Sequence, residues 1–210
     1  MIDKSFSLAH QVFEQIEQSI IKGDLPAGTI ISETELSKEY GVSRTPIREA
    51  LSMLEQEGLV DSKHSRIKVL GVSQQDLHDL LEIRILLEGR ACAAVAENIT
   101  DEGIEKLKDV YNLQEFYVSK GDTENISKMD TRFHRVLFKY CSRTYSRFLS
   151  EVHKKLHKYR AVAVDEKSKA EQSIHEHKAI LEAVEAKDAE RIKECVTMHV
   201  ENAKKRMLGE

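Results

Sequence analysis

The chain has 210 residues, of which 36 are acidic, 32 are basic and 40% are apolar, giving a net charge of −4. This composition is typical of a globular protein rather than a disordered one, and no apolar run approaches the ~18 residues of a membrane span. The net charge is −3 for residues 1–70 and −1 for residues 71–210, so any positively charged surface that binds nucleic acid would have to be a local patch. The N-terminus lacks the apolar core of a signal peptide, and three scattered cysteines indicate reduced thiols, so we expect a cytoplasmic protein.

Residues 5–70 open with two helical patterns. The first is an amphipathic helix with apolar residues at i, i+4 spacing, and it ends at Gly23. The stretch "DLPAGTI" is then a turn. Ser32 and Glu35 form a capping box that opens a short second helix, and Gly41 is a suitable residue to end it.

A third helix follows within "GVSRTPIREAL", residues 41–51. Ser43 can cap this helix, and Pro46 lies in its first turn, where a missing N–H costs little. Two short helices joined by a tight turn that contains glycine are typical of a helix-turn-helix. Two short apolar stretches around the polar tip "SKHSR" predict a β-hairpin, the wing of a winged helix, and residues 71–73 form a linker.

Arg44 and Arg48 lie one turn apart at the start of this third helix. An unpaired guanidinium is costly to bury, whereas the first turn of a recognition helix meets base edges in the major groove. Arginine also matches the O6 and N7 atoms of guanine. The predicted DNA contacts are Ser43, Arg44, Thr45 and Arg48, with Lys63, His64 and Arg66 at the hairpin tip. The alternative is a solvated basic face on an ordinary helix pair.

From residue 74 onward every segment has helical periodicity, and no proline follows Pro46. We therefore expect a mostly α protein whose second domain, residues 74–208, is entirely helical. The expected helices lie near 74–97, 101–118, 123–141, 144–163, 173–186 and 188–208. Ser173 with Glu176 is expected to cap the fifth of them.

The helical half contains a set of residues that could bind a metal. Asp130 and His134 stand at i, i+4 on one helix, so both can reach one ion, while His177 and His199 adjoin apolar positions that should face inward. Three imidazoles and a carboxylate would suit Zn²⁺, Ni²⁺, Mn²⁺ or Fe²⁺ and leave positions open for water or an anion. The spacing alone is weak evidence, because the chain has nine histidines and an Asp–His pair on a helix is often only a surface contact.

Other cationic residues have two interpretations. His153 and His157 also stand at i, i+4, but within the cationic stretch "HKKLHKYR", which favours a solvated face or an anion site over a metal site. Arg84 could form an i, i+4 pair with Glu88, or it could clamp the carboxylate of a ligand. Arg160 is a second candidate for the same ligand pocket.

Residues 23–60 resemble the winged-helix domain of the GntR superfamily of bacterial transcription regulators. The blocks "SETELS", "GVSRTPIREAL" and "LEQEGLV" stand in the order and spacing of that family. The resemblance implies that Arg44 and Arg48 contact operator DNA. This sequence departs from the family at Thr34, where many members carry another arginine that contacts DNA, and at the wing tip, which lacks the usual glycine.

Residues 73–208 are similar to the FCD ligand-binding domain of the FadR branch. The resemblance rests on "DLHDLLEIRILLEGRACAAVA", "DTRFHRVLF", "HEHKAILEAVEAKDAERI" and "MHV". It implies an antiparallel helical bundle that binds a divalent metal through Asp130, His134, His177 and His199. Six helices in this half would fit the shorter, VanR-like group.

We therefore expect a homodimeric transcription regulator, a repressor more than an activator, that binds a palindromic operator. A small organic acid would bind at the metal and pair with Arg84, and its binding would release the DNA. Two alternatives remain open at this point. One is an enzyme for metal-assisted hydrolysis, although no nucleophile and base are paired near the ligands in the sequence. The other is a regulator whose metal is purely structural.

Overall fold

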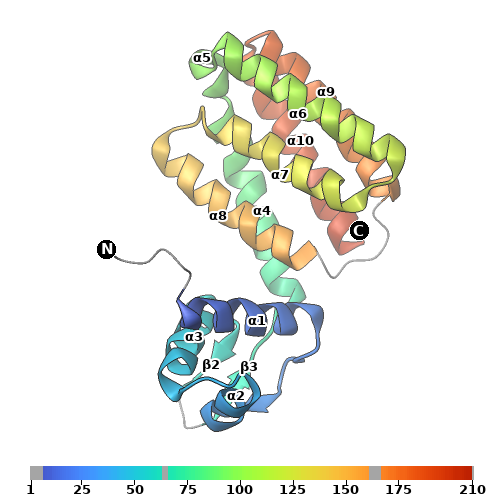
Figure 1. The fold of residues 1–210 in the computed structure, drawn as a ribbon. Helices are drawn as coiled ribbons and strands as arrows, with labels where there is room; N and C mark the ends of the chain where they lie inside the picture. The colour runs from blue at the N-terminus through green and yellow to red at the C-terminus, as the bar shows by residue number, and fades with distance from the viewer. Residues whose placement is uncertain (1–6, 63–65, 161–166, 210) are drawn as a thin grey trace. The chain divides into compact units, whose positions relative to one another are not determined.

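The computed structural model describes residues 7–62, 66–160 and 167–209, apart from the side chains of residues 157, 158, 160 and 167–169. The chain divides into two compact units, Met1–Ser73 and Gln74–Glu210 (Figure 1). No helix in the described part of the chain has the length and apolar character needed to cross a bilayer.

The first unit is a winged helix-turn-helix. Its elements are α1 (Leu8–Lys22), β1 (Ile30–Ile31), α2 (Glu33–Glu39), α3 (Arg44–Gln56), β2 (Val60–Asp61) and β3 (Ile67–Val69). The strands form an antiparallel sheet in the order β1-β3-β2, in which Val60 lies opposite Val69 and Ile31 opposite Ile67. The hairpin expected from the sequence is β2–β3. The interpretation of "DLPAGTI" as turn alone was wrong, because Ile30 begins a strand whose next side chain, Ile31, is buried.

Local signals in the sequence set the ends of these helices. The Ser32 side chain accepts a hydrogen bond from the backbone N–H of Glu35 at the start of α2, as the capping box predicts. Gly41 has a φ of 66°, a left-handed conformation that favours glycine, and it turns the chain from α2 into α3. Ser43 is the N-cap residue of α3, but its side chain makes no capping hydrogen bond.

The second unit is an all-helical bundle (Figure 1). Its elements are α4 (Gln74–Cys92), α5 (Val95–Asn98), α6 (Asp101–Lys120), α7 (Thr123–Phe138), α8 (Arg143–Arg160), α9 (Lys167–Glu185) and α10 (Ala189–Leu208). The bundle packs α4 against α10, α6 against α7 and α9, and α7 against α8. Its largest fully buried side chains include those of Phe133, Phe138 and Ile180.

Two of the helix boundaries expected from the sequence were wrong. The helix expected at 74–97 is divided into α4 and the four-residue α5, so the described part of this unit has seven helices rather than six. Neither proline nor glycine marks that break, and Val95 and Ala96 beyond it are buried, so packing decides it. Helix α9 begins six residues before Ser173, because the preceding lysine, alanine, glutamate and glutamine residues are good helix formers. Ser173 therefore lies within the helix and does not cap it.

The apolar interior of the bundle contains a group of polar side chains. Among the side chains of this unit that the structure describes, the buried polar ones are Arg84, Glu88, Gln114, Asp130, His134, His177 and His199. Burying a polar group costs free energy unless the group finds a partner, so their concentration in one core makes this region a candidate functional site.

Candidate nucleic-acid interface and metal centre

Helix α3 has one face in the core of the first unit and one face in solvent. Ile47 and Leu54 are fully buried, whereas Arg44, Thr45 and Arg48 are exposed. The side chains predicted to contact DNA on this helix therefore lie on its open face, as a recognition helix requires.

Both arginines bond to side chains of α2 in the DNA-free chain. Nη2 of Arg44 donates to Oγ1 of Thr34 at 3.3 Å, and Nε of Arg48 donates to the two carboxylate oxygens of Glu33 at 2.9 and 2.8 Å. The Arg48 side chain is nevertheless 66% exposed. A pair this exposed contributes little to stability, so Arg48 can leave Glu33 at a small cost in free energy.

The wing carries further positive charge. Arg66 is exposed next to β3, on the strand side of the hairpin tip. Lys63 and His64, which were also predicted to contact DNA, lie outside the described residues.

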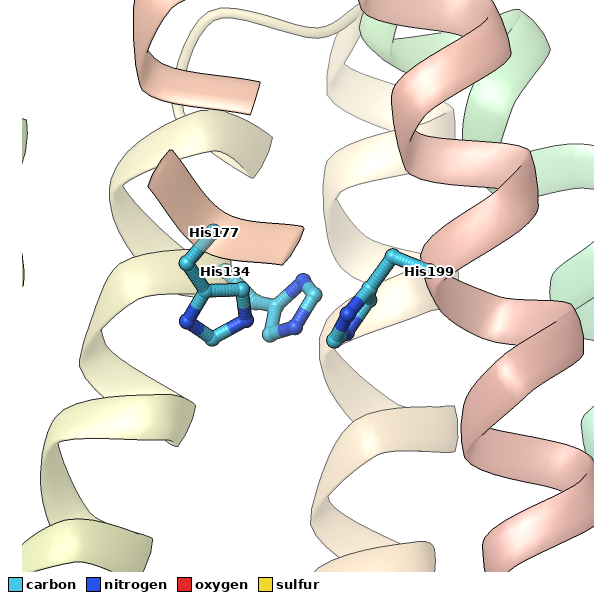
Figure 2. Close-up of side chains that lie close together, drawn as sticks. All are labelled: His134, His177 and His199. Atoms are coloured by element: carbon cyan, nitrogen blue, oxygen red, sulfur yellow. The ribbon is translucent and has the colours of Figure 1, made fainter. Parts of the chain in front are cut away.

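Three histidines from three helices meet inside the bundle (Figure 2). His134 of α7, His177 of α9 and His199 of α10 are each at most 1% exposed. One ring nitrogen from each lies within 4.8 Å of the other two. The ring centroids are 4.7–5.3 Å apart. The structure thus brings together all three histidines that the sequence singled out.

The carboxylate of the predicted set lies beside this cluster. Asp130 is buried one helical turn before His134, and its Oδ1 is 3.7 Å from Nε2 of His177. Among the described residues, the ligand atoms of the three histidines all lie within 4.8 Å of one another, and Asp130 is not part of that group. Asp130 is therefore adjacent to the centre without being part of its tightest group.

Two histidines of the cluster are oriented by acceptors on neighbouring helices. Nδ1 of His177 lies 2.7 Å from Oε1 of Gln114, and Nδ1 of His199 lies 2.8 Å from Oε2 of Glu176. A carboxylate can only accept, so Nδ1 of His199 donates and its Nε2 is left with a lone pair. Phe133 stacks on the His177 ring, with centroids 4.1 Å apart, and fixes its plane. Metal-binding histidines are commonly oriented in this way by an acceptor on the second nitrogen.

Glu176 is itself held by side chains of α10. Arg206 donates to both carboxylate oxygens at 2.7 and 2.8 Å, and Asn202 donates to one of them at 2.9 Å. Burial alone would raise the pKa of Glu176, but the hydrogen bonds from Arg206 and His199 lower it to about 2. Burial lowers the pKa of His199. The hydrogen bond with the Glu176 carboxylate favours the charged imidazolium, but burial outweighs it, so the net shift favours the neutral imidazole that a metal requires.

Glu88 is a second carboxylate inside the bundle, on the opposite side of His134. Its oxygens accept from Nε and Nη2 of Arg84 at 2.7 and 3.2 Å, and lie 3.0 Å from Nδ1 of His134 and Nε2 of His153. Burial by itself would raise the pKa of Glu88, but Arg84, His153 and His134 together outweigh it and hold that pKa well below its usual range. Arg84 thus forms the i, i+4 pair that the sequence allowed.

Glu88, His134 and His153 also meet the spacing of a metal site. We interpret this group as a charged cluster centred on Glu88 instead, because the guanidinium of Arg84 already lies on the carboxylate and would repel a cation. The sequence favoured a solvated face or an anion site for His153. A solvated face is wrong, since the side chain is only 10% exposed. The side chain of Arg160 lies outside the described residues.

The sequence did not single out the residues that orient the cluster. Gln114 lies between Val110 and Val118 on the buried face of α6, and a polar residue at an apolar position is a usable signal. Glu176 was expected from the sequence only as the partner of Ser173 in a helix cap, and nothing in its neighbourhood indicates that it orients a histidine. Its role depends on the position of α10.

Comparison with known proteins agrees with both units. The gntR family of bacterial regulatory proteins matches residues 8–66, and the FCD domain matches residues 79–202. An uncharacterised HTH-type transcriptional regulator of Bacillus subtilis, YdhC, is 30% identical over 202 residues, which cover 94% of this chain and 90% of the relative. The gluconate operon transcriptional repressor of Bacillus licheniformis is 26% identical over 131 residues, covering 62% of this chain and 54% of that protein.

The fold also has solved counterparts. The structure of E. coli McbR/YncC has a TM-score of 0.71 and 22% sequence identity, and the match covers 98% of both chains. The relatives are regulators of transcription and not enzymes, which removes the hydrolase alternative. The chain belongs to the GntR family of bacterial transcription regulators, as a member that joins a winged helix-turn-helix to an FCD domain.

Proposed function

We propose that this DNA-binding regulator is a repressor whose operator affinity depends on a divalent metal and a small organic acid in its helical bundle. The observation that carries the proposal is the buried meeting of His134, His177 and His199, with ring nitrogens within 4.8 Å of one another. Packing of the bundle does not require three buried imidazoles to point at one place. A metal ion is the partner that suits three nitrogen lone pairs.

The DNA side of the proposal rests on the exposed face of α3. Arg44 and Arg48 would contact bases or phosphates, and Ser43 and Thr45 would contact phosphates. In a homodimer, two copies of α3 would enter successive major grooves of a palindromic operator, roughly 34–36 Å apart. Arg66, with Lys63 and His64, would contact the flanking backbone.

The metal side rests on the chemistry of the donor set. His134, His177 and His199 would hold the ion through nitrogen, and Asp130 would supply the carboxylate oxygen. Such a set fits Zn²⁺, Ni²⁺, Mn²⁺ or Fe²⁺. The bound ion would supply a Lewis-acidic position that can hold an oxygen of a ligand. Gln114 and Glu176 would keep the rings of His177 and His199 aimed at the ion.

An organic acid is the class of effector that suits a bound divalent metal ion, because its carboxylate can bind the ion. One relative is named as the repressor of a gluconate operon, and gluconate carries a carboxylate. The guanidinium of Arg84 could bind the carboxylate of such an acid only if it released Glu88, its partner in this structure. For the acid to release DNA, it must bind one arrangement of the dimer more tightly than the other.

The test measures metal content and operator affinity on the same preparations. We expect about one divalent ion per chain, lost in His177→Ala and retained in the control His175→Ala, whose side chain is exposed two residues away on the same helix. Operator affinity, measured by fluorescence anisotropy with a labelled duplex, should change when the ion is removed by a chelator. Full metal occupancy in His177→Ala would contradict the assignment.

A purely structural metal is the second candidate, and the near-complete burial of His177 and His199 favours it. In that case removal of the ion would lower the melting temperature, while no organic acid would alter operator affinity in the metal-loaded protein. Screening acids for an effect on operator affinity separates the two candidates.

A further inference from the structure

The ion pair between Glu33 and Arg48 leaves most of the guanidinium unused. Glu33, in the first turn of α2, receives both of its hydrogen bonds from Nε of Arg48, at 2.9 and 2.8 Å. Within the described part of the chain, neither terminal nitrogen of Arg48, Nη1 or Nη2, makes a hydrogen bond. These two nitrogens carry four of the five N–H groups of an arginine. Arg48 can therefore bind a second partner at its outer edge while Glu33 stays in place.

A guanine base suits that outer edge. In the major groove it presents two neutral acceptors, O6 and N7, which an arginine binds with two N–H groups. Nη1 and Nη2 of Arg48 can supply both donors. The contact then needs no movement of Arg48 away from Glu33, and it brings no anion towards the Glu33 carboxylate.

A phosphate meets a less favourable environment at Arg48. A small hollow of about 170 Å³ is lined by Arg48 together with two acidic side chains, Glu33 and Glu55. Arg48 is the only lysine or arginine among the described residues of this lining, so two carboxylates oppose one guanidinium before DNA arrives. A phosphate oxygen at Nη1 or Nη2 would bring a further negative charge towards these carboxylates. Like charges within a Debye length repel one another, so the phosphate is disfavoured relative to a neutral base.

Arg44 offers a comparison on the same exposed face of α3. Its Nη2 donates to the hydroxyl of Thr34 at 3.3 Å, and this partner carries no charge. Adjacent residues of α2 thus hold the two arginines in different ways, Arg44 through a neutral hydroxyl and Arg48 through a carboxylate. Arg44 can accept a phosphate or a base with little difference in repulsion, whereas Arg48 distinguishes between them.

We propose that Glu33 is a specificity-determining residue, which makes Arg48 selective for the neutral edge of a guanine over a backbone phosphate. Non-specific binding depends on phosphate contacts, so the carboxylate weakens it more than it weakens binding to the operator. The proposal rests on the DNA contacts proposed above. It assigns Arg48 to a base and leaves Arg44 able to bind either partner.

The test compares wild-type full-length protein with Glu33→Gln, which keeps an acceptor for Nε of Arg48 and removes only the charge. One labelled duplex carries an operator obtained by repeated selection from a random duplex pool, and the other carries the same bases in scrambled order. Dissociation constants are measured by fluorescence anisotropy. Glu33→Gln should bind the scrambled duplex about twofold to fivefold more tightly and the operator more tightly by a smaller factor, so the ratio of the two affinities should fall roughly twofold to threefold.

The salt dependence of binding counts the phosphate contacts. Each neutralised phosphate contributes about −0.9 to the slope of log K against log salt concentration. In Glu33→Gln the carboxylate no longer opposes a phosphate at Arg48, so the slope on the scrambled duplex should steepen by up to ~0.9 for each α3 that engages it. The slope on the operator should stay unchanged, because Arg48 remains on its guanine. An unchanged slope on the scrambled duplex, or equal steepening on both duplexes, would overturn the proposal.

Two control variants separate this role from general electrostatics. Glu49→Gln removes the same charge from an exposed position of α3 next to Arg48, and it should change both affinities by the same factor. A fall in the affinity ratio equal to that of Glu33→Gln would overturn the proposal. In the background of Arg48→Gln, the change Glu33→Gln should alter neither the ratio nor the salt slope. A full effect in that background would show that Glu33 does not act through Arg48.

This proposal and the proposed DNA contacts can fail separately. If Arg48→Gln leaves operator affinity unchanged, Arg48 does not contact DNA, and its proposed contact and its selectivity both fail. If Arg48→Gln weakens operator binding while Glu33→Gln leaves the ratio and the salt slope unchanged, the DNA contact stands and the selectivity alone is wrong. Far-ultraviolet circular dichroism should show unaltered folding in every variant, because none of the three side chains is buried.

Discussion

The buried pair of Arg84 and Glu88 allows a prediction whose size follows from the structure. Arg84 is 3% exposed and Glu88 is fully buried, and the guanidinium reaches the carboxylate through two hydrogen bonds. Glu88→Gln keeps the shape of the side chain but leaves a guanidinium in the core without a countercharge. Arg84→Met leaves the carboxylate with only its imidazole neighbours, His134 and His153.

Each single change should lower the free energy of unfolding by about 3–5 kcal/mol, the usual cost of removing one partner from a buried ion pair. The changes should not add. Once Glu88 has lost its charge, removal of Arg84 also removes the uncompensated cation, so the double variant should lose less stability than the sum of the two single effects. A coupling of about 2–3 kcal/mol is expected for groups in direct contact.

The assay is urea denaturation of the metal-free full chain, followed by far-ultraviolet circular dichroism. All four proteins of the double-mutant cycle are compared under the same conditions, and stability is taken from the transition of the helical bundle. A double variant that loses the full sum of the two single effects would refute the reasoning. That result would mean that Arg84 and Glu88 stabilise the bundle independently, through packing and not through their charges.

Three further predictions concern both units of the chain. Glu33→Gln should tighten binding of a DNA duplex about twofold to fivefold at low salt, because it removes a carboxylate from the DNA-facing side and frees Arg48. Weaker binding in anisotropy titrations would instead show that Glu33 positions the arginine. Gly89→Ala should destabilise the bundle by about 1–3 kcal/mol, because its Cβ would come within 2.7 Å of the carbonyl oxygen of Lys193 on α10; an unaltered melting temperature would contradict this close approach. Burial and the charge of Arg84 lower the pKa of His153 to about 3. The neutral His153 side chain therefore contributes its full stability above pH ~6.5, the ordinary pKa of histidine, and this contribution is lost as the pH falls towards 3. Urea titrations of His153→Gln at several pH values should show a shallower loss in this window, and a slope equal to that of the wild type would contradict the assignment.

The short-range signals in the sequence were sufficient to place the helices of the DNA-binding unit. Ser32 with Glu35, Gly41, and the arginines at the start of α3 each act within one or two helical turns, so neighbouring residues alone specify them. The strand β1 was missed because its existence depends on pairing with β3, nearly forty residues later. A two-residue strand has no periodicity of its own.

At the candidate metal centre, too, the sequence determined the relations within one helix and the tertiary structure determined the contacts between helices. The sequence by itself determined that Asp130 and His134 share one face of a helix, since the α-helical repeat fixes that relation. Only the tertiary structure decided that His177 and His199 meet His134, and that Gln114, 63 residues away from His177, orients its ring. Periodicity tells which side of a helix faces inward, but the packing of helices decides which inward side chains meet and which buried charges neutralise one another.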